Sequence, residues 1–229
     1  GLIESGTAIA ILMGMLFGTF FITAGFGRFY VSFVMIGLAV VGYLSTWFMP
    51  PAPPAQADMK LNWNLPVETW ATVKAAMARR DVWLSILGIS WFWLLGVVFL
   101  SQIQPFTKVV LHANLSASTV ILALFSLATG LGSAACNRIL KGRITVRYVP
   151  LAALLLSVFT FDLYFSSSSF GSLFTEAAPA LPSDMFAHFS GWHAMLDLAG
   201  IAFMSGLFVV PLFAMMQART PYYARARIV

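Results

Sequence analysis

Residues 118–161 read STVILALFSLATG, then LGSAACNRILKGRITVRY, then VPLAALLLSVFTF, so two apolar runs flank a short basic turn. The first run carries no charge. Four of the thirteen basic residues of the chain fall within the ten positions 138–147. This pattern is typical of two membrane helices joined by a loop that is retained on the cytoplasmic side.

The rest of the chain has the same character. Of its 229 residues, 60% are hydrophobic and 9% are charged, whereas a soluble domain carries about 25% charged residues. Several apolar stretches reach the roughly 20 residues that are needed to cross a hydrocarbon core. The alternating segments of about ten residues that mark a membrane β-barrel are not seen. The composition therefore predicts an all-α polytopic membrane protein.

Six transmembrane helices are expected, and a polar connector separates the second from the third. The connector begins at Pro50 with the proline-rich PPAPPAQAD. It continues into VETWATVKAAMARR, where Val67, Trp70, Val73 and Met77 form an apolar stripe at helical spacing. This stripe predicts a short helix lying on the membrane surface, and a plain solvated helix is the alternative. The six predicted helices cover residues 6–26, 30–49, 82–111, 116–136, 148–165 and 194–217.

The basic residues fall mainly in alternate connectors. Eleven of the thirteen would lie on one side of the membrane, and only Arg28 and Lys108 on the other. Lys and Arg are retained on the cytoplasmic face during insertion. The linker, the turn near Arg143 and the C-terminal end are therefore predicted to be cytoplasmic, and the serine-rich connector 166–193 to be outside.

Several functional classes find no support in the sequence. The net charge of +5 lies in short connectors, as orientation in a membrane requires, and does not indicate nucleic-acid binding. Cys136 is the single cysteine, so an internal disulfide is excluded. The three histidines, His112, His188 and His193, are predicted to be solvated, without a metal or cofactor. No histidine begins a His-x-x-x-x-Asp motif of glycerolipid acyltransferases, so the segment is predicted not to be an enzyme.

Charged residues within membrane helices are costly, so each is a candidate functional residue. Lys108 stands in SQIQPFTKVV, close to Gln102 and Gln104. Asp162 and Asp197 fall on two neighbouring predicted helices at similar depth. The alternatives are that Lys108 reaches the outer interface with its flexible side chain and that both aspartates are solvated near the outer boundary.

The basic turn GLGSAACNRILKGR, together with the helix order, resembles the major facilitator superfamily. The turn is similar to the cytoplasmic loop between the eighth and ninth helices of these transporters. The resemblance implies a gating role for Asn137, Arg138, Lys141 and Arg143, with a plain cytoplasmic anchor as the alternative. It also implies a fragment that covers helices five to ten: residues 1–49 from the N-terminal bundle, 50–81 as the cytoplasmic linker and 82–229 from the C-terminal bundle.

A closer resemblance is to the bacterial lysophospholipid transporter family. It is carried by LIESGTAIAILMG, VPLAALLLSVFTFDLYF, LDLAGIAFMSGLFVVPLFAMMQART and the terminal RARIV. The resemblance implies flipping of lysophospholipids, chiefly lysophosphatidylethanolamine, across the bacterial inner membrane for reacylation. Fused or associated acyltransferase and acyl-ACP synthetase domains are implied partners, with membrane lipids as the surroundings.

With such a substrate, Lys108 is expected to bind the phosphate, and Gln102 and Gln104 the glycerol or headgroup. Asp162 and Asp197 are expected to bind the ethanolamine ammonium, pair with Lys108 or take a proton. A lateral opening and an apolar groove for one acyl chain are also expected. Two alternatives are an exporter of drugs or metabolites and a membrane anchor for fused acyltransferase domains.

Overall fold

In the computed structural model the chain is all-helical. The structure describes residues 27–50, 64–140 and 144–221, together with scattered positions before residue 22. Most of the predicted first helix 6–26, most of the proline-rich linker, Lys141, Arg143 and the terminal RARIV lie outside the described residues. The prediction of six transmembrane helices in a major facilitator bundle therefore stays a prediction.

Five of the described helices are long and apolar enough to cross a membrane. They are α2, α4 with its extension η1, α5, α6 and α8. The chain is thus a helical protein of the multi-pass membrane type. In order, the elements are α2 (Gly27–Thr46), α3 (Leu65–Met77), α4 (Arg80–Pro105), the π-helical η1 (Phe106–Val110), α5 (Leu115–Ile139), α6 (Val149–Gly171), α7 (Pro182–Ala187) and α8 (Phe189–Arg219).

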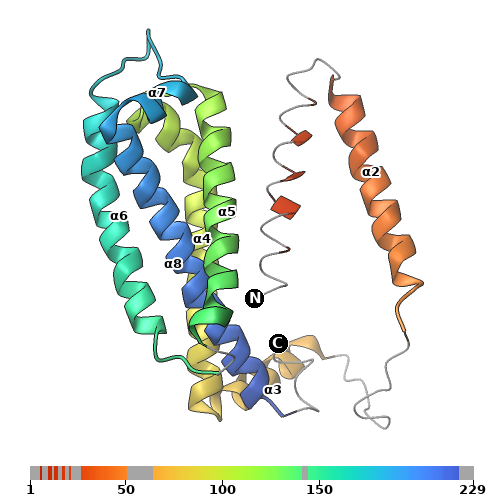
Figure 1. Cartoon of the computed structure of the whole chain (residues 1–229). Helices are drawn as coiled ribbons and strands as arrows, with labels where there is room; N and C mark the ends of the chain where they lie inside the picture. The colour runs from red at the N-terminus through yellow and green to blue at the C-terminus, as the bar shows by residue number, and fades with distance from the viewer. Residues whose placement is uncertain are drawn as a thin grey trace.

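Helix α8 is the central element, and α4, α5 and α6 pack around it (Figure 1). Near α7 the fully buried side chains are Leu111, Ile121, Phe170, Met185 and Ile201. Towards the other end, α4 and α8 share a second apolar cluster around Val82, Val209 and Leu212. Many large apolar side chains of the bundle are exposed, such as Val97, Leu127 and Phe161, as expected of a surface that faces lipid. Helix α2 stands apart in Figure 1, and its apolar side chains are exposed.

Helices α5 and α8 approach each other closely where they cross. A Cβ added at Gly132 would collide with the backbone carbonyl of Phe203. A Cβ at Gly206 would lie 2.6 Å from the carbonyl oxygen of Thr129. Small residues at such crossings let the helix backbones pack directly on one another. The small residues that open the basic turn in the sequence therefore serve helix packing.

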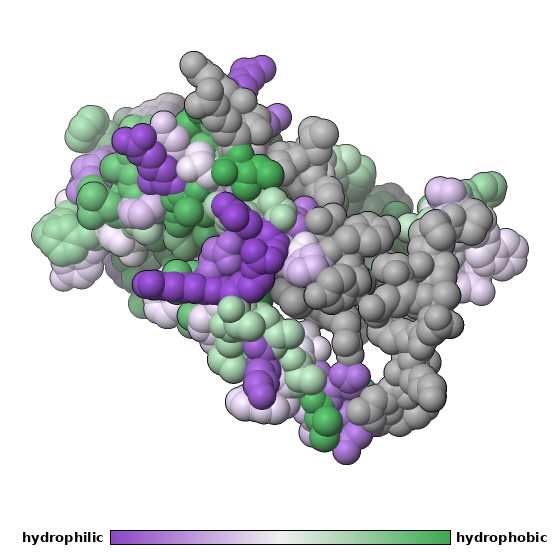
Figure 2. Space-filling model, turned by 90° about the horizontal axis from the view of Figure 1, so that it is seen from below, coloured by the Kyte–Doolittle hydropathy of each residue, from purple (hydrophilic) through white to green (hydrophobic). Residues whose placement is uncertain are grey.

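Basic residues gather at one end of the bundle. Helix α3, the 144–148 segment and the end of α8 lie there, opposite α7 (Figure 1). Figure 2 looks at this end and shows hydrophilic residues over it. An ion pair between Asp81 and Arg219, with 3.6 Å between Nε and Oδ2, joins the start of α4 to the end of α8. The described basic residues at this end are Lys74, Arg79, Arg80, Arg138, Arg147 and Arg219.

Two helix boundaries differ clearly from the predicted ones. Helix α6 continues through the serine run to Gly171, although the sequence predicts an end at Phe165. The hydroxyls of Ser166 and Ser167 donate to carbonyl oxygens three residues earlier, at 3.4 and 3.3 Å. Serine in an apolar helix satisfies its hydroxyl in this way, so the run does not end the helix. Helix α8 begins at Phe189, five residues before the predicted start.

The two prolines of the long helices behave differently. Helix α8 passes through Pro211 without ending, as predicted. Helix α4 ends at Pro105, and the next five residues form the π-helix η1. Proline removes a backbone donor, and a π-helical turn is a common local adjustment in membrane helices. This change of winding sets the position of Lys108, which lies in η1.

Candidate functional site

A pocket of about 740 Å³ opens at the end of the bundle near α7. It lies where η1 leads into α5, and the 174–180 segment closes one side of it. Lys108 of η1 and Gln104 of α4 line it together. Glu176 lines it from the 174–180 segment, and Asn114 lines it from the start of α5. The pocket thus brings a cation, an anion and two amide side chains to one place.

Backbone hydrogen bonds hold the walls of this pocket. The amide of Asn114 donates to the carbonyl of Ala180 at 3.0 Å, and the amide of Ala180 donates to the carbonyl of His112 at 2.8 Å. His112 has a φ of 47°, in the left-handed region. This conformation is strained for a residue other than glycine. The chain reverses there between η1 and α5, and Ala180 ties the segment that carries Glu176 to this reversal.

Lys108 and Glu176 are available to a ligand. Neither forms an ion pair with any residue that the structure describes. Lys108 is exposed, and it lies at the opposite end from the basic residues around α3. An ammonium and a carboxylate that face one pocket match a ligand that carries both a negative and a positive charge.

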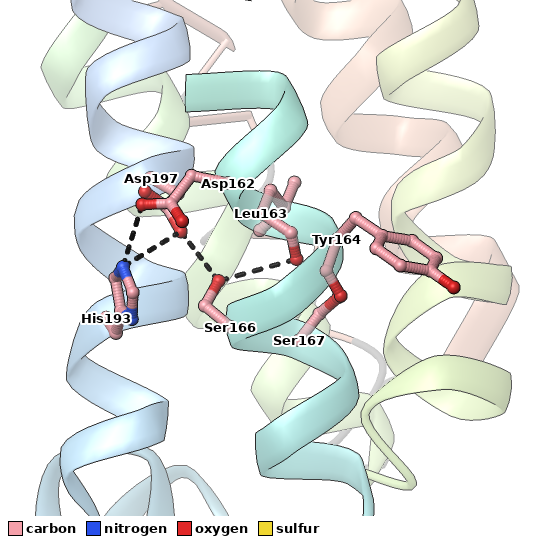
Figure 3. Close-up of polar contacts among 7 residues, drawn as sticks. All are labelled: Asp162, Leu163, Tyr164, Ser166, Ser167, His193 and Asp197. Carbon is pink, nitrogen blue, oxygen red and sulfur yellow. Dashed lines mark hydrogen bonds and ion pairs between the residues drawn. The ribbon is translucent and has the colours of Figure 1, made fainter. Parts of the chain in front are cut away.

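A second polar cluster lies between α6 and α8 (Figure 3). His193 Nε2 is 2.9 Å from Asp162 Oδ2 and 3.9 Å from Asp197 Oδ2. Ser166 donates its hydroxyl to Asp197 Oδ2 at 2.6 Å. The Asp197 side chain is only 3% exposed, whereas those of Asp162 and His193 are 45% and 39% exposed. The cluster is therefore buried on one side and open on the other.

No protein-family model, curated protein or solved structure matches this chain. The function is therefore inferred from the residues and their geometry.

The structure separates the predicted substrate residues into two places. Lys108 and Gln104 share the pocket, whereas Gln102 is exposed on α4 and is not among the residues that line it. Asp162 and Asp197 come together as their similar depth predicts. Their partners are His193 and Ser166, and neither forms the expected ion pair with Lys108.

Of the four predicted gating residues, the structure describes two. Asn137 and Arg138 lie in the last turn of α5, and both are exposed. Lys141 and Arg143 lie outside the described residues. The gating role of the turn therefore stays a prediction.

The prediction that all three histidines are simply solvated is wrong for His193, which contacts Asp162, and for His112, whose Nδ1 is buried. His193 and Asp197 are four residues apart, so they lie on the same face of α8. This spacing, with an aspartate on the neighbouring helix, is the signal that identifies the cluster. Glu176 has no comparable signal, because its place in the pocket depends on tertiary contacts of its segment, among them the bridge between Ala113 and Ala180.

Proposed function

We propose that this chain belongs to a major facilitator transporter that flips lysophospholipids, chiefly lysophosphatidylethanolamine, across the bacterial inner membrane. The observation that carries the proposal is the pair of opposite charges in one pocket, Lys108 and Glu176. A zwitterionic headgroup has a phosphate for the first and an ammonium for the second. Gln104 and Asn114 supply hydrogen bonds to the single free glycerol hydroxyl and the acyl ester.

A second pocket supports a substrate with one acyl chain. It has a volume of about 610 Å³ and shares His112 with the first pocket. Its apolar lining includes Phe106, Val109, Val110 and Leu163. A headgroup beside Lys108 would leave its acyl chain next to this apolar surface. The proposal assigns the headgroup to the first pocket and the acyl chain to the second.

The arrangement of the bundle ends supports the proposed orientation. The end with Arg79, Arg138 and Arg219 is placed in the cytoplasm, because basic loops are retained there. The Lys108 pocket then opens to the outer leaflet. In this proposal the basic turn gates the transporter, the chain itself catalyses no reaction, and reacylation belongs to fused or associated domains.

Uptake of labelled lysophosphatidylethanolamine into spheroplasts that contain the full-length protein tests the proposal. We expect uptake above that of spheroplasts without the protein. We also expect unlabelled lysophospholipid to compete, and amphipathic drugs or metabolites not to compete. Competition by drugs alone would favour an exporter. No uptake, with intact activity of any fused acyltransferase, would favour a membrane anchor.

The Glu176→Gln variant tests the headgroup assignment. The amide keeps the size of the side chain and removes its charge, so the contact with the ethanolamine ammonium weakens. A charge-assisted hydrogen bond is worth about 1.5–3 kcal/mol. We therefore expect the preference for lysophosphatidylethanolamine over lysophosphatidylglycerol to fall roughly tenfold in competition assays. Asp184→Asn, within α7 and outside the pocket lining, is the control and should keep the preference. An unchanged preference in Glu176→Gln would refute the assignment.

A further inference from the structure

The cluster between α6 and α8 has the geometry of a metal site. Asp162, His193 and Asp197 each offer one ligand atom, and these atoms all lie within 4.8 Å of one another. A tetrahedral ion with bonds of about 2.1 Å to nitrogen and oxygen separates its ligand atoms by about 3.4 Å. The two distances from His193 Nε2, 2.9 and 3.9 Å, lie on either side of that value. Small side-chain rotations would therefore seat one ion.

The two carboxylates give the cluster a negative charge that a bound cation would neutralise. Two carboxylates face one imidazole, and neither carboxylate pairs with a Lys or Arg among the described residues. Both aspartates lie within helices long and apolar enough to cross a membrane. A charge without a partner inside a membrane has a high free energy. One divalent cation would neutralise both carboxylates.

The ligand types indicate the class of metal. Ca²⁺ and Mg²⁺ take oxygen ligands almost exclusively. An imidazole nitrogen with two carboxylate oxygens suits Zn²⁺ and other first-row divalent ions. The half-exposed side chains of Asp162 and His193 leave room for water as a further ligand. Ser166 holds Asp197 by a hydrogen bond, as outer partners of metal ligands commonly do.

We propose that Asp162, His193 and Asp197 bind a divalent transition-metal ion of the Zn²⁺ class, which bridges α6 and α8. The site is distinct from the Lys108 pocket, with which it shares no lining residue. It rests on the cluster geometry alone, independently of lysophospholipid transport. A ligand that binds only the folded state stabilises it, so the metal should raise the melting temperature.

Spectroscopy with Co²⁺, a coloured substitute for Zn²⁺, tests the proposal on the purified full-length protein after removal of metals by a chelator. We expect visible absorption bands of low-symmetry Co²⁺ that saturate at one equivalent and are displaced by Zn²⁺. We also expect a higher melting temperature with Zn²⁺ and no comparable rise with Mg²⁺. Absence of the bands in the unmodified protein would overturn the proposal.

Two variants localise the ion. His193→Gln and Asp162→Asn should each lose the Co²⁺ bands and the Zn²⁺-dependent rise in melting temperature. The control His188→Gln removes an exposed histidine outside the cluster and should keep both. His193 and Asp162 are both partly exposed, so we expect both variants to fold. One folded variant is enough for the comparison. Retention of bands of the same intensity in a folded variant would overturn the assignment.

Discussion

Replacing Lys108 with alanine is expected to reduce uptake of lysophosphatidylethanolamine about tenfold or more. Lys108 is the cation that lines the pocket near α7, beside Glu176 and Gln104. A hydrogen bond to a charged phosphate is worth about 1.5–3 kcal/mol, and each 1.4 kcal/mol corresponds to a factor of ten. Initial uptake rates in spheroplasts with equal amounts of protein provide the measurement.

Two further variants make this result specific. Lys108→Arg keeps the positive charge and should retain a substantial part of the uptake, because guanidinium also binds phosphate. Lys74→Ala removes a lysine of α3, at the opposite end of the bundle, and should transport normally. Equal uptake by Lys108→Ala and the unmodified protein would remove Lys108 from the substrate site.

Replacing Gly132 with leucine is expected to cause a large loss of stability. The added Cβ would collide with the carbonyl of Phe203, and a backbone atom cannot move aside as a side chain can. Overpacking costs about 1–3 kcal/mol, and more where the backbone must shift. We expect a sharply reduced yield of monodisperse protein in detergent and a lower melting temperature of the remainder.

Gly96→Leu is the matched control for this prediction. Gly96 also lies within a long helix, α4, but a Cβ added there would meet nothing within 4 Å. The control should therefore fold with nearly the yield and melting temperature of the unmodified protein. If Gly132→Leu were as stable as Gly96→Leu, the close crossing of α5 and α8 would be wrong.

The long helices follow from the sequence because each needs about 20 apolar residues. Their ends are less predictable. The serine run 166–169 has the composition of a connector, yet it is helical. Ser166 and Ser167 donate to carbonyls of the same helix, and Ser166 also donates to Asp197. The central position of α8 is also not readable from the sequence, since every helix is apolar on most faces and contacts decide which one is buried.

Residues of the candidate site can be predicted only where a charged residue stands in an apolar stretch of sequence or apart from other charges of its kind. Lys108 stands out as a basic residue far from the other basic residues, and the structure places it in a pocket. Asp162 and Asp197 stand out as charges within apolar helices. Glu176 lies in a connector with ordinary composition, and its place beside Lys108 depends on hydrogen bonds between segments distant in the chain. Tertiary contacts alone determine that part of the site.

Cysteine accessibility tests most directly the central claim that the bundle crosses the membrane with the Lys108 pocket outside. Cys136 is buried and is replaced with serine, so that single cysteines can be introduced at exposed positions. A membrane-impermeant maleimide should label Ser183→Cys, in α7, in intact spheroplasts. It should label Val146→Cys, in the basic connector, only after permeabilisation. Labelling of Val146→Cys in intact spheroplasts, with Ser183→Cys protected, would contradict the account.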